Sequence, residues 1–261
     1  MNEKNNSAAE SYFYFMCHLH KTALNFAEHL QFDKKHPWHL HLVSLYGSII
    51  ELTGSACILV QETVGIGVPI LLRSAVEAHL DFTNLAANRR YGYHLRASEL
   101  KEWVKLLRES KDGINPFLKE IADFPNTNEI LNKWEKELEK LKGKNYKPLS
   151  VFDKFNRANL EPVYRSVYNI LCGHSHNNIR ELISRHVNIS EEMNDFNVEF
   201  YAPINFDRLL PYIDNFCSII VSATETIHQI LKTDCIKEIE KLKTEFQKQR
   251  NASMTGQGNE E

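Results

Sequence analysis

Two segments of the chain place polar side chains four residues apart within otherwise apolar, helix-spaced sequence. Arg73 precedes Glu77 in the first segment, and Tyr168 precedes Cys172 and His176 in the second. Because residues four apart lie on one side of an α-helix, each set is expected to form a row along its helix. We expect a helical bundle to keep a functional site where two such rows face each other.

The first row has the chemistry of an anion-binding pair. The guanidinium of Arg73 can bind a phosphate or a carboxylate through two parallel donors, and Glu77 can orient the arginine or accept a proton. The alternative is a solvent-facing stripe with one intrahelical ion pair, worth about 0.3 to 0.5 kcal/mol. An arginine that precedes a glutamate by four residues stabilises a helix less than the reverse order does. Stabilisation of the helix is therefore a weak reason for Arg73 and Glu77 to be there.

The second row places His176 at its edge, beside Arg165 and Arg180. Neighbouring arginines are expected to disfavour the protonated imidazole, which suits a neutral general base near physiological pH. The alternative is a histidine that is merely hydrogen-bonded at a helix edge. Cys172 shares a face with apolar residues, so it is expected to pack as a small hydrophobic side chain.

The neighbouring histidines His174 and His176 raise the question of a metal site. On a helix, two steps of about 100° turn their rings to nearly opposite sides, so the two could share an ion only if Gly173 interrupts the helix. No carboxylate or cysteine stands at an evident ligand spacing, and the chain has no phosphate-binding or dinucleotide-binding glycine motif. We therefore predict no metal and no other cofactor.

Composition narrows the class of protein. The 261 residues are 43% hydrophobic and 25% charged, which is ordinary for a globular protein, and the net charge of -3 gives no overall basic field for nucleic acid. Five scattered cysteines without a C-x-x-C pair fit a reducing cytosol. No secretory signal is visible, and polar residues, glycines and a proline interrupt the apolar stretch 58–72. These features predict a cytoplasmic protein without a membrane span.

Helix-spaced apolar residues recur along the chain, so the fold class predicted is all-α, an antiparallel helical bundle. One domain is expected over 7–233, with a charged peripheral helical insertion over 112–150, a charged helical extension over 234–250 and a disordered tail over 251–261. A short extended segment is expected over 197–203. The expected helices are 7–30, 38–63, 69–90, 92–110, 128–142, 161–185, 206–231 and 237–250.

Two segments carry a resemblance to a known family. The stretch 71–78 reads L-x-R-S-x-x-E-A, and 164–176 is a tyrosine-containing helix that ends near a histidine. Over roughly 42–185 the chain resembles an uncharacterised bacterial all-helical family of unknown function. That family looks like a relative of the HEPN helical bundles, many of which are metal-independent ribonucleases or nucleotide-binding modules in toxin and phage-defence systems.

The resemblance implies a ribonuclease or another RNA-acting defence component, with RNA or a nucleotide as partner and a homodimer that completes the site. It implies that His176 is the general base or acid and that Glu77 and Tyr168 orient the reacting groups. The implied phosphate-binding residues are Arg73, Arg165 and Arg180. HEPN ribonucleases carry an R-x(4–6)-H pattern, which this chain matches at Arg73 to His79, Arg89 to His94 and Arg180 to His186. Arg73 and His79 point about 120° apart on one helix, so that pair departs from a standard HEPN site, whereas Arg180 to His186 stays open if the helix ends near Ser184.

Two other functions stay open. The first is a non-catalytic helical module that binds a small ligand or a partner protein, with Arg73 and Glu77 as a structural pair. The second is a metal-dependent hydrolase that uses His174 and His176.

Overall fold

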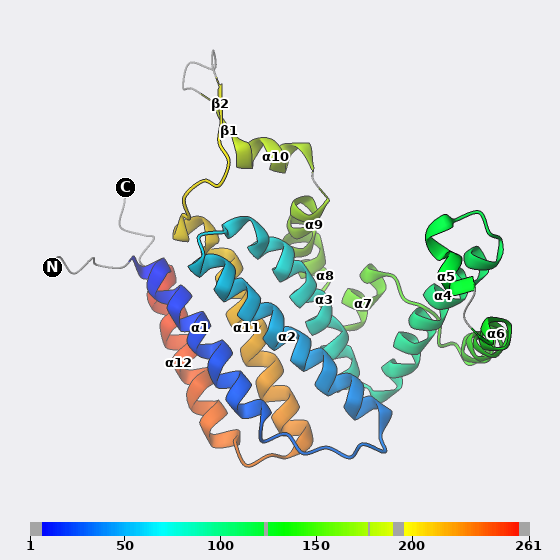
Figure 1. Cartoon of the computed structure of the whole chain (residues 1–261). Coiled ribbons are helices and arrows are strands. Elements are labelled where there is room, and N and C mark those ends of the chain that lie inside the picture. Colours follow the sequence, from blue (N-terminus) through cyan, green and yellow to red (C-terminus); the bar gives the residue numbers. More distant parts are fainter. Residues whose placement is uncertain (1–6, 123–124, 177, 190–195, 256–261) are drawn as a thin grey trace.

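The computed structural model describes residues 7–122, 125–176, 178–189 and 196–255, and helices make up most of it (Figure 1). The prediction of an all-α helical bundle is confirmed. The strands in this part of the chain form one small antiparallel hairpin, β1 (Val187–Ile189) and β2 (Phe196–Val198), with Val187 opposite Val198. Of the extended segment expected over 197–203, only residues 197 and 198 belong to a strand, which pairs with β1.

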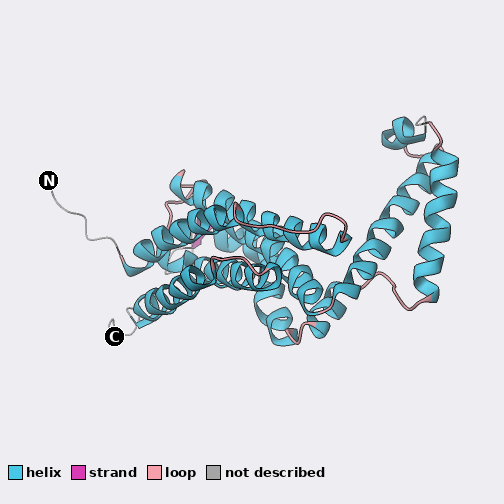
Figure 2. Cartoon of the chain, turned by 90° about the horizontal axis from the view of Figure 1, so that it is seen from below, coloured by secondary structure: helices cyan, strands magenta, loops and turns pink. Residues whose placement is uncertain are grey.

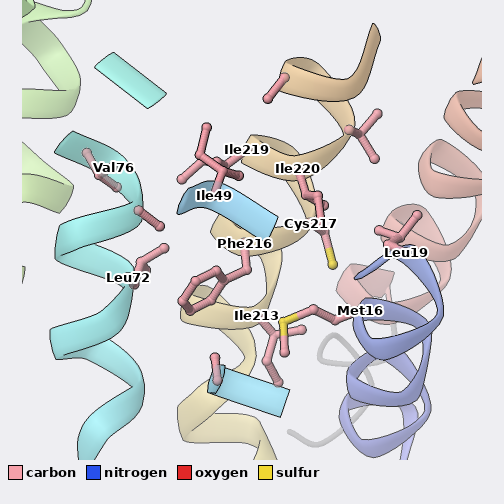
Figure 3. Close-up of a cluster of buried hydrophobic side chains, with 14 of the residues drawn as sticks. Met16, Leu19, Ile49, Leu72, Val76, Ile213, Phe216, Cys217, Ile219 and Ile220 are labelled. Atoms are coloured by element: carbon pink, nitrogen blue, oxygen red, sulfur yellow. The ribbon is translucent and has the colours of Figure 1, made fainter. Parts of the chain in front are cut away.

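Five long helices form the main bundle, and α11 lies at its centre, in contact with the other four. Consecutive helices joined by short connections run antiparallel, as in α1 and α2, α2 and α3, and α11 and α12 (Figure 1). Their buried side chains meet around α11 (Figure 3), where Phe216 and Cys217 are fully buried. The five helices are α1 (Ala8–Ala27), α2 (Pro37–Gln61), α3 (Val68–Ala87), α11 (Phe206–Leu231) and α12 (Ile236–Thr255).

Helix α2 is apolar over most of its length. Among the described residues it is the one helix long and apolar enough to cross a membrane by length and composition, a test that the core helix of a soluble protein also meets. It packs against α1, α3 and α11 through buried residues such as Leu42, Tyr46 and Ile49. These contacts account for its apolar face within the bundle.

A helical arm extends from the bundle (Figure 2). Its two long helices, α4 (Gly92–Lys111) and α6 (Thr127–Gly143), pack against each other through two small apolar clusters. The insertion expected over 112–150 is helical, and α4 belongs to the same arm. Arg96 and Glu137 hold the two helices together with a bidentate pair of 2.9 and 3.0 Å. The short elements η2 (Arg89–Tyr91), η3 (Pro116–Leu118) and α5 (Lys119–Ala122) complete this region.

The single helix expected over 161–185 is instead a series of short elements, so that prediction was wrong. Helix α9 ends at Ser175, His176 lies in a turn, and the side chain of Asn178 accepts a hydrogen bond from the first turn of the next helix. Glu181 packs closely over Gly173: a Cβ atom added at Gly173 would lie 3.3 Å from Cγ of Glu181. The elements are α7 (Val151–Arg157), α8 (Glu161–Val163), the π-helical turn η4 (Tyr164–Tyr168), α9 (Asn169–Ser175) and α10 (Ile179–His186).

The charged helix expected over 237–250 packs on the bundle as α12. Its Leu242 and Phe246 join the main core, and its Arg250 forms an ion pair of 2.8 Å with Asp214 of α11. The helix continues to Thr255, so residues 251–255 are helical and not disordered as expected, while 256–261 lie outside the described residues. The remaining short element is η1 (Gly65–Gly67), which precedes α3.

Candidate functional site

The two polar rows meet between α3 and the segment formed by η4 and α9. Arg73 donates hydrogen bonds from Nη1 to Ser175 Oγ at 3.1 Å and from Nη2 to Tyr168 OH at 3.4 Å. Tyr168 OH donates to Glu77 Oε1 at 2.6 Å, and Arg73 Nη2 lies 3.3 Å from the same oxygen. We call Arg73, Glu77, Tyr168 and Ser175 the arginine cluster.

The arginine cluster combines a buried phenol with two partly exposed charges. Tyr168 is 4% exposed, whereas the side chains of Arg73 and Glu77 are 26% and 41% exposed. Burial, followed by the hydrogen bond to Glu77, raises the pKa of Tyr168, so the phenol stays a neutral donor. The hydrogen bond with Tyr168 raises the pKa of Arg73. The cluster therefore holds a fixed positive charge beside a carboxylate that is open to solvent.

Arg73 also lies against the ring of Tyr168, with Cζ 5.7 Å from the ring centroid. Its Nε atom is buried and has no hydrogen-bond partner within the described residues. A guanidinium has five N–H donors, and the contacts of the cluster use only some of them. Arg73 therefore keeps donor capacity beyond its contacts within the protein.

A π-helical turn sets the position of Tyr168. The segment Tyr164–Tyr168 follows Pro162, which has no backbone N–H, and Ser166 Oγ donates to the carbonyl oxygen of Pro162 at 2.7 Å. The rings of Tyr164 and Tyr168 stack at a centroid distance of 5.6 Å. Such turns occur often at functional sites, because the extra residue re-aims the side chains that follow.

The structure leaves three of the predicted site residues outside the arginine cluster. His176 follows Ser175 directly, and its exposed side chain has no hydrogen bond or ion pair within the described part of the chain. Arg165 is exposed and forms an ion pair of 2.6 Å with Glu161. Arg180 is exposed in the first turn of α10. Of these three, His176 is adjacent in sequence to a member of the cluster.

The model of a family described as "Family of unknown function (DUF5677)" matches residues 39–196. The match covers more than half of the chain and all four residues of the arginine cluster. The chain belongs to this family. No curated protein and no solved structure matches it. The expected membership of an uncharacterised family is thus confirmed, while the HEPN likeness and the bacterial origin stay predictions.

The DUF5677 match leaves out α1, α11 and α12, yet α11 completes a second polar group beside the arginine cluster. Nε2 of His174 lies 3.1 Å from Tyr212 OH, and Nδ1 lies 3.4 Å from Glu181 Oε2. Burial lowers the pKa of His174, an effect that Arg185 reinforces and Glu181 opposes. The neutral ring then donates from Nδ1 to the carboxylate and accepts from the tyrosine.

Sequence reasoning missed parts of both groups. Ser175 lies seven residues after Tyr168, close to two helical turns, so its place on the same side was a visible signal. His174 was considered only as a metal ligand, and its partner Tyr212 belongs to a distant helix outside the DUF5677 match. No local pattern indicates that contact.

A cavity of about 420 Å³ lies at the same end of the bundle, between α10, η1 and the start of α11. Its lining includes Arg185, His186 and Arg208 and no aspartate or glutamate. Neither arginine side chain forms a hydrogen bond or an ion pair within the described residues. The aromatic side chains of Phe200 and Tyr201 at its wall are 71% and 87% exposed. The cavity therefore joins unpaired positive charge to exposed aromatic surface.

Tyr201 has a φ angle of 57°, in the left-handed region that L-residues rarely adopt. Such strain costs on the order of 1 to 3 kcal/mol and gathers at sites where the surroundings enforce it. The segment that carries Phe200 and Tyr201 is thus held in an unusual backbone conformation at the wall of the cavity.

The Tyr168 hydroxyl is expected to stabilise the fold measurably. Because Tyr168→Phe leaves Glu77 and Arg73 without their shared partner, it should lower the free energy of unfolding by about 1 to 3 kcal/mol. Urea denaturation followed by circular dichroism measures this change. Tyr164→Phe is the matched control, since its ring stacks on Tyr168 but its hydroxyl makes no hydrogen bond in the described structure. Equal stabilities of the two variants would show that the cluster contributes nothing.

Proposed function

We propose that this protein acts on RNA as a metal-independent ribonuclease, with its site at the arginine cluster and His176. One observation carries the proposal: the fixed cation of Arg73 is held by Glu77, Tyr168 and Ser175, and Ser175 directly precedes an exposed histidine that has no hydrogen bond or ion pair in the described structure. A phosphate-binding arginine and a free imidazole are the two groups that phosphodiester transfer within RNA requires.

The proposed reaction uses each group in a defined role. His176 takes the proton of a ribose 2′-hydroxyl, and the 2′-oxygen forms a bond to the adjacent phosphorus. The bond from phosphorus to the 5′-oxygen breaks, and that oxygen takes up a proton from water. Arg73 stabilises the charge that builds up on the phosphate oxygens, and Glu77 and Tyr168 hold the guanidinium in place. The products are a 2′,3′-cyclic phosphate and a 5′-hydroxyl.

Arg165 and Arg180 serve this proposal as further phosphate-binding residues, because both are exposed on the segment that carries His176. The Arg180 side chain forms no hydrogen bond or ion pair in the described structure, whereas Arg165 would first have to leave Glu161. Arg180 is therefore the better candidate of the two.

The cavity at the same end of the bundle supports an RNA substrate. Exposed aromatic rings give unpaired bases a surface for stacking, and arginines without carboxylate partners bind phosphates. Phe200 and Tyr201 supply the rings, and Arg185 and Arg208 supply the charges. We propose that a single strand of RNA lies across this cavity as it approaches His176.

The arginines of the cavity are expected to set the affinity for RNA. Replacing Arg185 and Arg208 together by alanine should weaken the binding of a single-stranded oligonucleotide and reduce the salt slope of log K by about 0.7 for each phosphate that is no longer neutralised. Fluorescence anisotropy at several salt concentrations measures both quantities. Arg108→Ala, which removes an arginine that is paired with Glu135 in the arm, should change neither. An unchanged slope in the double variant would exclude the cavity as the RNA site.

The reaction itself is tested by incubating the purified protein with single-stranded RNA in a buffer without added magnesium or manganese. Products that end in 2′,3′-cyclic phosphate support the proposal, and intact RNA at high protein concentration contradicts it. Two further proposals rest on the HEPN resemblance: a homodimer that completes the site, and a role in a toxin or phage-defence system. A cytoplasmic location is proposed from the scattered cysteines. The dimer predicts a particle of twice the mass of the chain in solution.

A second candidate function is a non-catalytic module that binds a small ligand or a partner protein. The observation that favours it is the burial of Tyr168 and the use of Arg73 to join α3 to α9 through Ser175, as a structural clasp would do. This candidate predicts that loss of Arg73 affects stability alone.

A further inference from the structure

A second group of reactive side chains lies at the opposite end of the bundle, where α1 ends and α11 turns into α12 (Figure 1). His29 Nδ1 lies 3.9 Å from Asp234 Oδ1, and Cys235 Sγ lies 3.6 Å from the same oxygen. The three donor atoms all lie within 4.8 Å of one another. We propose that His29, Asp234 and Cys235 bind a zinc ion that joins α1 to the turn between α11 and α12.

The spacing of the donors fits the coordination sphere of zinc. Zinc bonds to nitrogen, oxygen and sulfur are about 2.0 to 2.3 Å long, so donors at a tetrahedral angle lie about 3.3 to 3.8 Å apart. The observed separations of 3.6 and 3.9 Å are close to these values. The donor atoms of the third pair, His29 and Cys235, lie within 4.8 Å of each other.

The turn that presents two of the donors is fixed by its own contacts. Lys232 ends α11 with a φ angle of 54°, in the left-handed region. Thr233 donates its backbone N–H to the carbonyl oxygen of His228 at 3.2 Å, and its hydroxyl lies 2.7 Å from His228 Nδ1. Helix α12 begins directly after Cys235. Two of the three ligands are thus held in place before any ion arrives.

Exposure and charge favour entry of a cation. The side chains of His29 and Asp234 are 55% and 88% exposed, whereas Cys235 is buried beneath them. Glu238, three residues along α12, adds negative charge beside the thiol. Water or the Glu238 carboxylate would supply the fourth ligand of a tetrahedral zinc ion.

Zinc binding displaces the thiol proton of Cys235. An ordinary cysteine thiol carries its proton at neutral pH. Binding then replaces the S–H bond with a bond from sulfur to zinc and releases one proton to water. The three residues lie far from the arginine cluster along the bundle (Figure 1), so the zinc site is independent of the proposed function.

The test is titration of the metal-free protein with zinc sulfate in competition with a chromophoric chelator. We expect one equivalent of zinc per chain, and binding weakened roughly tenfold or more in His29→Ala, Asp234→Asn and Cys235→Ser. Cobalt binding should give a sulfur-to-metal charge-transfer band that Cys235→Ser abolishes. Zinc should also raise the melting temperature of the wild type but not that of His29→Ala.

The controls use residues of the same types elsewhere in the chain. His18→Ala removes an exposed histidine of α1, and Cys172→Ser removes a partly buried cysteine, so both should bind zinc as the wild type does. His29 and Asp234 are exposed, so their replacement leaves the core intact. No bound zinc in the wild type, or equal zinc binding in the wild type and His29→Ala, overturns the proposal.

Discussion

Replacing His176 with alanine is expected to reduce RNA cleavage about 10²- to 10⁴-fold, the usual contribution of a general acid or base. His176 is exposed in the turn after α9 and its side chain forms no hydrogen bond or ion pair in the described structure, so its replacement is expected to cost little stability. The melting temperature should therefore stay within about 1 °C of the wild type, since surface substitutions change stability little. Lost activity in a fully stable protein is the signature of a chemical role.

The measurement is single-turnover cleavage of a labelled RNA strand with enzyme in excess, so that weaker binding is not mistaken for slower chemistry. His18→Ala is the control, because it removes another exposed histidine from a helix far from the cluster in the sequence. His176→Gln keeps a hydrogen-bonding group but cannot carry the proton, and it should be as inactive as the alanine variant. Cleavage by His176→Ala at the rate of the wild type would show that His176 is not the general acid or base.

The helical periodicity of the sequence predicted the meeting of the two rows. Arg73 and Glu77 share one side of α3, and Tyr168 of the second row meets them there. His176 of that row lies outside the cluster, and Ser175, which was not predicted, belongs to it. The apolar stripe of α11 likewise predicted its bounds, Phe206–Leu231. Such features repeat every three or four residues along one helix, so a single sequence contains them.

The break after Ser175 could not be predicted in the same way. It depends on Glu181 packing over Gly173 and on Asn178 capping α10, which are contacts between segments that a continuous helix would keep apart. The π-helical turn that ends at Tyr168 shifts the helical register by one residue, although no local sequence preference marks it strongly. These are tertiary effects that override the local pattern.

Helix α12 was interpreted as a charged extension because its lysines and glutamates dominate its composition. Ile239, Leu242 and Phe246 nevertheless lie three and four residues apart and form the buried stripe that packs on the bundle. The signal was present in the sequence. By contrast, the donors His29 and Asp234 come from opposite ends of the chain, and only the fold brings them together.

Replacing Arg73 with alanine is expected to lower both stability and activity, and the ratio of the two effects identifies the role of the cluster. Removing the interactions with Ser175, Tyr168 and Glu77 should lower the free energy of unfolding by about 1 to 3 kcal/mol. If Arg73 stabilises the charge of the reacting phosphate, the cleavage rate per folded molecule should also fall about 10²- to 10³-fold. Urea denaturation and single-turnover cleavage measure the two quantities on the same samples.

Arg96→Ala is the matched control, because Arg96 is a similarly exposed arginine that joins two helices through Glu137. It should lose stability without losing activity per folded molecule. Arg73→Lys keeps the charge but cannot reach Ser175 and Tyr168 together, so it should recover only part of both properties. An Arg73→Ala protein that melts early yet cleaves at the full rate once corrected for folding would make the cluster a structural clasp. The site would then have to be sought around His176 and the neighbouring cavity.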